Sequence, residues 1–289
     1  MSHKKSASQR NSQLPQNTKY DAVIIGSGHN GLVAAAYLAM AGKSVLVLEK
    51  NDSFGGATAS QRVFPDYDAL LSRYSYLVSL LPSKILKDLG LQFETCTRRI
   101  ASFTPWKDSG GNHRGLVLSN VDTARSRDSM LQLTGKHSAW DRYQEFLALQ
   151  TSIAKIVWPT MLRPLESRET FQSKLVTQQQ KKAWQSFVDR PLGEAIEEYI
   201  DNDVLRGLVM TDGKIGVFTH AHDPGLLQNR CFLYHIIGNE TGEWRVPIGG
   251  MKSLVDSLLS RCRSLGVELV SGSGADHVEL GPQQHEVTL

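Results

Sequence analysis

The chain has 289 residues, of which 40% are hydrophobic and 21% charged, a composition typical of a globular protein with an apolar core. Its 32 basic and 29 acidic side chains leave a net charge of +3, which provides no electrostatic basis for binding nucleic acid. No apolar run reaches about 18 residues, so we expect no transmembrane segment, while peripheral membrane contact stays open.

The N-terminal segment is basic, rich in Ser and Gln, and free of acidic side chains. We predict a disordered leader over residues 1–19, because the segment lacks the apolar stripe of a mitochondrial presequence that its composition otherwise matches. The cysteines, Cys96, Cys231 and Cys262, are odd in number and far apart, which favours a reducing compartment. We therefore expect a soluble intracellular protein, cytoplasmic in a bacterium, with the mitochondrial matrix as the alternative in a eukaryote.

A strand, a helix and a second strand are predicted at the start of the folded part. The segment DAVIIG, Asp21 to Gly26, is a short apolar run that ends at a glycine, which indicates a buried parallel strand. An i, i+3, i+4, i+7 pattern of apolar residues begins at Leu32 and predicts a helix, which Gly42 ends. The run SVLVLEK then predicts the second strand, so this segment is a βαβ unit with a right-handed crossover.

The middle of the chain is predicted to be mostly helical. Trp140 and Phe146 share one face of a helix that Pro159 ends. Asp189 is predicted to cap a further helix, with Pro191 in its first turn. This block is interpreted as a substrate or cap region inserted after the nucleotide-binding segment.

Towards the C-terminus the pattern returns to helix and strand. An amphipathic helix through Leu254 and Leu258 precedes a strand at Val267 to Val270, and the chain stops inside a predicted β-ribbon. We therefore expect a truncated fold, because such an ending leaves a sheet edge open. The predicted regions are a Rossmann segment over 20–120, the helical region over 121–240, and a return to the nucleotide-binding domain over 241–289.

Three glycines form a GxGxxG pattern between the first predicted strand and its helix. Gly26 permits the tight turn, Gly28 lets the backbone approach a pyrophosphate, and Gly31 lets helix and strand pack closely. The phosphates are expected on the free amides of the first helical turn, which includes Asn30. The pattern predicts a dinucleotide site because it follows a strand and opens a helix.

Glu49 ends the second predicted strand, where a carboxylate accepts hydrogen bonds from ribose hydroxyls. Its charge would repel a 2′-phosphate, so NADP is disfavoured. A solvated glutamate at a strand end is the alternative. Lys50 is a further candidate for contact with the cofactor, with an ordinary surface lysine as an equal alternative.

A second glycine pair, Gly55–Gly56, follows Glu49 after five residues. The whole stretch resembles the extended motif of flavoproteins of the glutathione-reductase type, and it favours FAD over NAD as the cofactor. The resemblance implies an α/β fold with a Rossmann-type FAD-binding domain and an inserted, mostly helical region. Taken alone, the glycine pair would indicate only a turn.

The disulfide reductases of that group are disfavoured because no cysteine pair follows the glycines. The chain resembles instead the phytoene-desaturase-like flavoproteins. The matching segments, in the family's order, are YDAVIIGSGHNGLVAAAYLAMAGKSVLVLEK, LLSRYSYLVSLL, ASFTPW, MTDGKIGVFTHAHDPG and WRVPIGGMKSLVDSL. Family members continue well beyond this length, so the resemblance implies that this chain corresponds to an N-terminal half. It also implies that Ala275 lies against the adenine, and Ala57 replaces an arginine of the amine-oxidase type.

Other candidate sites are weaker. His220 and His222 have a spacing that suggests a metal, but a closed site needs four ligands, so no metal site is predicted. His235 lies in an apolar run and is interpreted as a core histidine, with a position near the flavin as the alternative. Arg73 and Tyr74 either line a flavin or substrate channel or simply pack as surface residues.

These features predict an FAD-dependent oxidoreductase whose flavin takes a hydride from a C–H or C–N bond of a small apolar or amphipathic substrate. One alternative is a non-catalytic FAD-binding regulatory protein or an inactive truncated form, because a fold alone does not define a function. An NAD-dependent dehydrogenase is a further alternative. The sequence identifies no catalytic acid or base and no oligomeric state.

Overall fold

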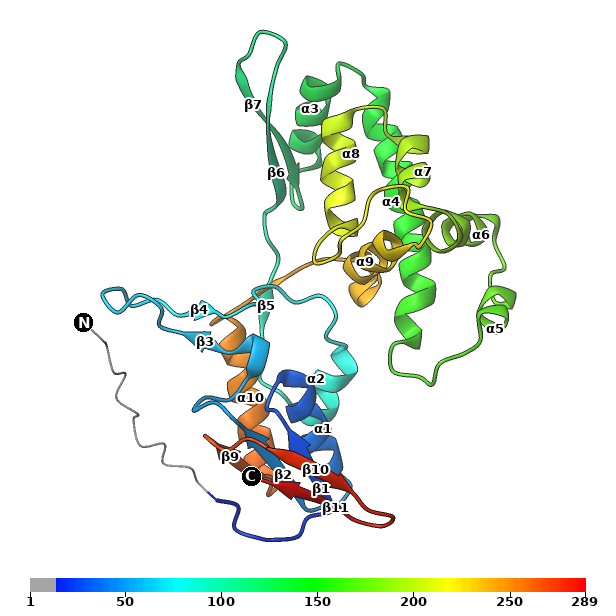
Figure 1. Ribbon diagram of the computed structural model, residues 1–289. Helices are drawn as coiled ribbons and strands as arrows, with labels where there is room; N and C mark the ends of the chain where they lie inside the picture. Colours follow the sequence, from blue (N-terminus) through cyan, green and yellow to red (C-terminus); the bar gives the residue numbers. More distant parts are fainter. Residues whose placement is uncertain (1–13) are drawn as a thin grey trace, which may run out of the picture. The chain divides into compact units, whose positions relative to one another are not determined.

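The computed structural model describes residues 14–289, so most of the predicted leader lies outside the described residues (Figure 1). The described chain divides into two compact units. The first unit comprises residues 14–78, 82–96 and 246–289, and the second comprises 79–81 and 97–245. The predicted boundary at residue 120 therefore falls inside the second unit.

A three-stranded parallel sheet forms the centre of the first unit. Its strands are β1 (Ala22–Ile25), β2 (Val45–Glu49) and β9 (Glu268–Ser271), in the order β1-β2-β9. Every residue of β2 is buried, which explains why this strand reads as a continuous apolar run. The strands and the intervening helix predicted from the sequence are thus confirmed.

Helices lie on one face of this sheet. Helix α1 (His29–Met40) packs against α10 (Met251–Ser264), and α2 (Ser83–Leu89) lies beside α1. The buried side chains of α1 are Leu32, Ala35 and Ala36, so small residues allow the close approach. The predicted amphipathic character of α10 is also confirmed.

An antiparallel hairpin, β10 (His277–Leu280) and β11 (His285–Thr288), is the predicted β-ribbon (Figure 1). Val287 of β11 packs against the buried Leu46, Leu48 and Val270 of the sheet. Two short pairs complete the unit, β3 (Ser60–Gln61) with β4 (Leu71–Ser72) and β5 (Thr95–Cys96) with β8 (Val246–Pro247).

The second unit combines one long hairpin with seven α-helices in its described residues. The hairpin consists of β6 (Ile100–Lys107) and β7 (His113–Ser119). The helices are α3 (Thr123–Thr134), α4 (Ser138–Val157), α5 (Arg168–Ser173), α6 (Gln178–Trp184), α7 (Leu192–Tyr199), α8 (Asp203–Met210) and α9 (Leu227–Ile236). The aromatic core contains Phe146, Phe187 and Phe232, whose ring centroids lie 5.4–6.2 Å apart.

The hairpin belongs to the second unit because it is bonded to α3. Ser129 Oγ accepts from the amide of Val117 at 2.8 Å, and Ser126 Oγ accepts from the amide of Ser119 at 2.8 Å. These two serine hydroxyls of α3 thus accept hydrogen bonds from backbone amides of β7 that have no strand partner. From the sequence we placed residues 100–119 in the Rossmann segment, because no local pattern indicates the hydrogen bonds between this hairpin and α3.

One helix start differs from the prediction. Helix α4 ends at Val157, just before Pro159, as predicted. Pro191 rather than Asp189 is the N-cap of α7. The Asp189 carboxylate instead accepts a hydrogen bond from Trp184 Nε1 at 3.0 Å and pairs with Arg168, so its contacts are with the preceding helices and not with α7.

Two further observations concern the whole described chain. No helix within residues 14–289 is long and apolar enough to cross a membrane. All three cysteines are unpaired, with Cys231 and Cys262 buried and Cys96 exposed.

Candidate functional site

The glycine-rich turn connects the carboxyl end of β1 to the start of α1. The Gly26 amide donates to the Leu48 carbonyl of β2 at 2.7 Å, and Gly26 has a φ of +95°, a conformation that favours glycine. Gly28 is the N-cap of α1, and its carbonyl accepts the first helical bond, from the Leu32 amide at 3.0 Å. The amides of the first helical turn have no partner within the helix and carry its positive dipole end.

Two glycines of this turn differ in what surrounds them. A Cβ on Gly31 would lie 2.5 Å from the Gly26 carbonyl oxygen, so strand and helix pack too closely for any side chain. A Cβ on Gly28 would meet nothing within 4 Å. Open space therefore lies beside the backbone where a pyrophosphate is predicted to approach. Asn30 is exposed in the same helical turn.

The second glycine pair lies directly on the first turn. The Gly55 amide donates to the Ser27 carbonyl at 3.1 Å, and Gly28 and Gly55 form a parallel β-bridge. Gly55 and Gly56 have φ values of +116° and +55°. A Cβ on Gly56 would lie 3.0 Å from the Gly28 Cα, so a glycine is required for the two segments to approach each other.

Glu49 lies at the centre of this site and is only 4% exposed. Its Oε2 accepts from the Ser27 amide at 3.0 Å and from Ser27 Oγ at 2.7 Å. Its Oε1 accepts from the Asn51 amide at 3.0 Å and from Asn51 Nδ2 at 2.6 Å. Burial opposes ionisation, but these hydrogen bonds outweigh it and hold the pKa of Glu49 below its usual value.

The chain after β9 passes along the same edge of the sheet. The Ser273 amide donates to the Glu49 carbonyl at 3.0 Å, and the Gly272 amide donates to the Asn51 carbonyl at 3.0 Å. A Cβ on Gly274 would lie 3.0 Å from the Lys50 Cβ, and Ala275 follows as a half-buried residue. The structure thus brings all nine predicted positions to the carboxyl edge of one sheet: Gly26, Gly28, Asn30, Gly31, Glu49, Lys50, Gly55, Gly56 and Ala275.

Three residues of this site were not singled out from the sequence. Ser27 is fully buried and joins Glu49 to Gly55, whose amide lies 3.2 Å from Ser27 Oγ. Asn51 holds the other oxygen of Glu49. His29 begins α1, and burial lowers its pKa, which favours the neutral ring at this helix start. In the sequence, only the hydroxyl of Ser27 could have indicated this role, because a buried carboxylate such as Glu49 requires nearby hydrogen-bond donors.

The tyrosines that follow the second glycine pair are exposed. Tyr74 and Tyr76 are 72% and 73% exposed, and the Arg73 guanidinium lies 5.6 Å from the centre of the Tyr74 ring. Other large apolar side chains of the same segment are exposed as well, namely Val63, Phe64, Tyr67, Leu70 and Leu71. This segment of the first unit therefore presents an apolar surface.

Two of the histidines singled out from the sequence, His222 and His235, contact protein groups. His222 Nε2 lies 3.0 Å from a carboxylate oxygen of Glu197, and no group of three metal-binding side chains occurs within residues 14–289. His235 Nδ1 donates to the Cys231 carbonyl at 2.7 Å, and its ring lies 5.4 Å from that of Trp244. Burial raises the pKa of nearby Asp212, and the interaction with His235 reduces this increase.

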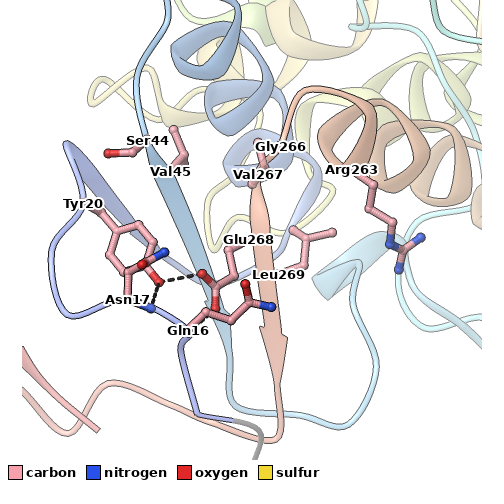
Figure 2. A pocket seen from close by; sticks show the side chains of 10 residues that line it. All are labelled: Gln16, Asn17, Tyr20, Ser44, Val45, Arg263, Gly266, Val267, Glu268 and Leu269. Carbon is pink, nitrogen blue, oxygen red and sulfur yellow. Dashed lines mark hydrogen bonds between the residues drawn. The ribbon is translucent and has the colours of Figure 1, made fainter.

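A cavity of about 420 Å³ lies at the opposite end of the strands, where β2 and β9 begin (Figure 2). Its central group is the Glu268 carboxylate, which accepts from the Tyr20 hydroxyl at 2.6 Å and from the Gln16 amide at 2.6 Å. Arg263 stands apart from this group in the figure. The cavity is therefore separate from the glycine-rich turn.

The family comparison defines the class of the first unit. Residues 24–84 match the NAD(P)-binding Rossmann-like domain, which spans both glycine segments. The first unit therefore contains a segment that is similar to NAD(P)-binding Rossmann-like domains.

Curated relatives are similar to nearly the whole chain. Over 266 residues, 91% of the chain, it is 42% identical to the uncharacterized protein Rv0897c of Mycobacterium tuberculosis. Over 291 residues, 92% of the chain, it is 29% identical to pyridine nucleotide-disulfide oxidoreductase domain-containing protein 2 of Rattus norvegicus. The chain is homologous to the N-terminal half of the latter protein, and it spans about half the length of both relatives, 49% in each case.

A solved structure supports the same fold. A putrescine oxidase variant whose cofactor binding was redesigned matches with a TM-score of 0.55 at 18% identity. The match covers 93% of this chain and 54% of that protein. At this identity the likeness shows the fold alone.

Proposed function

We propose that the first unit binds FAD and that the protein is an FAD-dependent oxidoreductase that takes a hydride from a C–H or C–N bond of a small apolar or amphipathic substrate. The observation that carries the proposal is the packing of Gly56 on Gly28. Two glycine segments that meet backbone to backbone form one crevice, and the resemblance to the glutathione-reductase type associates that arrangement with FAD.

The residues present fit such a cofactor. The open space beside Gly28 and the free amides at the start of α1 suit the pyrophosphate. Glu49 and Lys50 lie at the adjoining strand end, where the ribose of a dinucleotide binds, and Ala275 lies beside them for the adenine. The flavin itself, when bound, supplies the redox chemistry, and the protein supplies orientation and exclusion of water.

The exposed apolar segment of the first unit supports the class of substrate. Phe64, Tyr67, Leu70, Leu71 and Tyr74 are each at least 45% exposed. Several exposed large apolar side chains within one short segment are consistent with a surface that binds an apolar ligand or partner. It follows Gly56 closely in the chain, so it belongs to the same unit as the proposed cofactor site.

NAD is the second candidate cofactor, because the matched domain is described as NAD(P)-binding. The buried charge of Glu49 disfavours NADP, since a 2′-phosphate would lie next to a carboxylate. A non-catalytic dinucleotide-binding protein would use the same residues, so the test must separate binding from reduction.

The decisive experiment is calorimetric titration of the full chain with FAD and with NAD⁺, with flavin fluorescence and absorption as a second readout for FAD. Gly28→Val places a side chain in this open space: the φ of −61° at Gly28 suits any residue, and no atom lies within 4 Å of the added Cβ. We expect Gly28→Val to fold normally and to lose at least tenfold in FAD affinity. Ala34→Val, on the exposed side of α1, serves as the matched control and should bind normally.

Two results would overturn the assignment. Preferential binding of NAD⁺, with no flavin bound, would replace FAD by NAD. Unchanged FAD binding by Gly28→Val would show that the glycine turn is not the site. Bound flavin that no amine or polyene donor reduces would favour the non-catalytic alternative.

A further inference from the structure

Glu49 cannot accept a ribose hydroxyl in the conformation observed. A carboxylate has about four positions at which it accepts hydrogen bonds, and protein groups use four of them here. With only 4% of its surface exposed, Glu49 offers no further oxygen lone pair to a ligand. A dinucleotide that binds through this residue must therefore displace one of the four donors.

The four donors differ in how easily they leave. Ser27 supplies two of them, and it is fully buried and bonded to Gly55. The backbone amide of Asn51 supplies the third, and the Asn51 carbonyl is held by the Gly272 amide. The fourth donor is the Asn51 carboxamide, which belongs to an exposed residue. Side-chain rotation of Asn51 frees Oε1 and leaves every backbone bond intact.

We propose that the Asn51 carboxamide is a gate of the dinucleotide site: it holds the acceptor on Glu49 that a ribose hydroxyl requires, and it swings away when the ligand binds. The inference rests on the proposed dinucleotide-binding function and names the residue that regulates it. The carboxamide N–H and the ribose O–H are both donors, so one hydrogen bond to Oε1 replaces the other. Asn51 is thus a positioning residue that acts through Glu49.

This proposal predicts that a substitution of Asn51 increases ligand affinity, which a general loss of stability would not do. In Asn51→Ala the carboxylate oxygen is free of competition, so ligands with ribose hydroxyls should bind more tightly. A net hydrogen bond to a charged group corresponds to an affinity change of at least about fivefold. A ligand that lacks those hydroxyls gains nothing, because it cannot use the freed oxygen.

The test titrates the full chain with ADP and with its 2′,3′-dideoxy analogue, and then with FAD. For Asn51→Ala we expect at least fivefold tighter binding of ADP and FAD and unchanged binding of the dideoxy analogue. Ser53→Ala is the matched control, because Ser53 is exposed in the same loop and makes none of these bonds. Circular dichroism melting of both variants reports whether the fold is preserved.

The outcomes separate this proposal from the proposed function. If the wild type binds FAD and Asn51→Ala binds ADP equally or more weakly, the gate is refuted and the cofactor assignment stands. Weaker binding would mean that Asn51 itself contacts the ligand. If neither protein binds any dinucleotide, both proposals fail. Equal tightening of ADP and the dideoxy analogue also refutes the gate, because the effect would not act through the ribose.

Discussion

Alanine at position 31 is predicted to destabilise the first unit, although alanine favours a helix over glycine. Gly31 lies in the first turn of α1, and an added Cβ would be 2.5 Å from the Gly26 carbonyl oxygen and 3.2 Å from Ile24 Cγ2. Real Cβ contacts are essentially never shorter than 3.0 Å, so helix and strand must separate by at least about 0.5 Å. The nearest atom is backbone, which cannot rotate out of the way.

The magnitude follows from two opposing effects. Overpacking of a close contact costs about 1–3 kcal/mol. Replacement of glycine by alanine in a helix returns about 0.5–1 kcal/mol. At the middle of both ranges, Gly31→Ala lowers the free energy of unfolding by about 1 kcal/mol.

Gly207→Ala is the matched control in this comparison. Gly207 is exposed on α8, and a Cβ there would meet nothing within 4 Å, so the same substitution should stabilise by about 0.5–1 kcal/mol. Urea unfolding followed by circular dichroism measures both changes, and hydrogen exchange assigns each one to its unit. A Gly31→Ala chain as stable as the wild type would refute the argument from close packing.

The remaining predictions concern two buried side chains, Glu49 and Phe146, and the half-buried Asp212. Glu49→Gln should lower the free energy of unfolding at pH 7 by about 1–3 kcal/mol, because the NH₂ group of the glutamine would face hydrogen-bond donors. Since the folded pKa of Glu49 is lowered, the wild type loses this advantage as the pH falls below about 4, so the difference in urea unfolding should shrink. A difference that stays constant with pH would contradict this reasoning. Asp212→Asn should be more stable than wild type at pH 8 and equal to it near pH 3, because burial raises the folded pKa of Asp212 and the wild type loses stability as the pH rises through that value. A melting temperature that follows the wild type at both pH values would count against a buried charge at this position. Phe146→Ala should cost about 3–5 kcal/mol in urea unfolding, because Phe146 is fully buried among aromatic rings, and a loss below about 1 kcal/mol would show that the core repacks.

Much of the first unit could be predicted because its signals are local. A strand buried on both faces must be apolar throughout, and β2 is such a strand. The backbone alone requires glycine at two positions: Gly26 has a positive φ, and Gly31 lies in close contact with the strand. Such requirements leave a trace in the residue type itself, so the turn could be recognised without knowledge of the rest of the fold.

The features that could not be predicted depend on residues that are distant in the sequence. Asp189 has the residue type of a helix cap, but Trp184 and Arg168 engage its carboxylate. The hairpin of β6 and β7 joins the second unit through Ser126 and Ser129, whose hydroxyls replace strand partners. Side chains that bond to whichever group lies nearest carry no periodic signal, so only the folded structure identifies their partners.

The two halves of the proposed dinucleotide site differ in readiness for a ligand. Beside Gly28 the space is open and the helix amides are free, so the region proposed for the pyrophosphate needs no rearrangement. At Glu49 every acceptor position is used, so the region proposed for the ribose becomes available only when the Asn51 carboxamide leaves. A ligand anchored by its phosphates holds its ribose beside Glu49 at high effective concentration, which favours exchange of one donor for another. Recognition in this order would reject isolated nucleosides, because they must displace Asn51 without the phosphate contacts that come first.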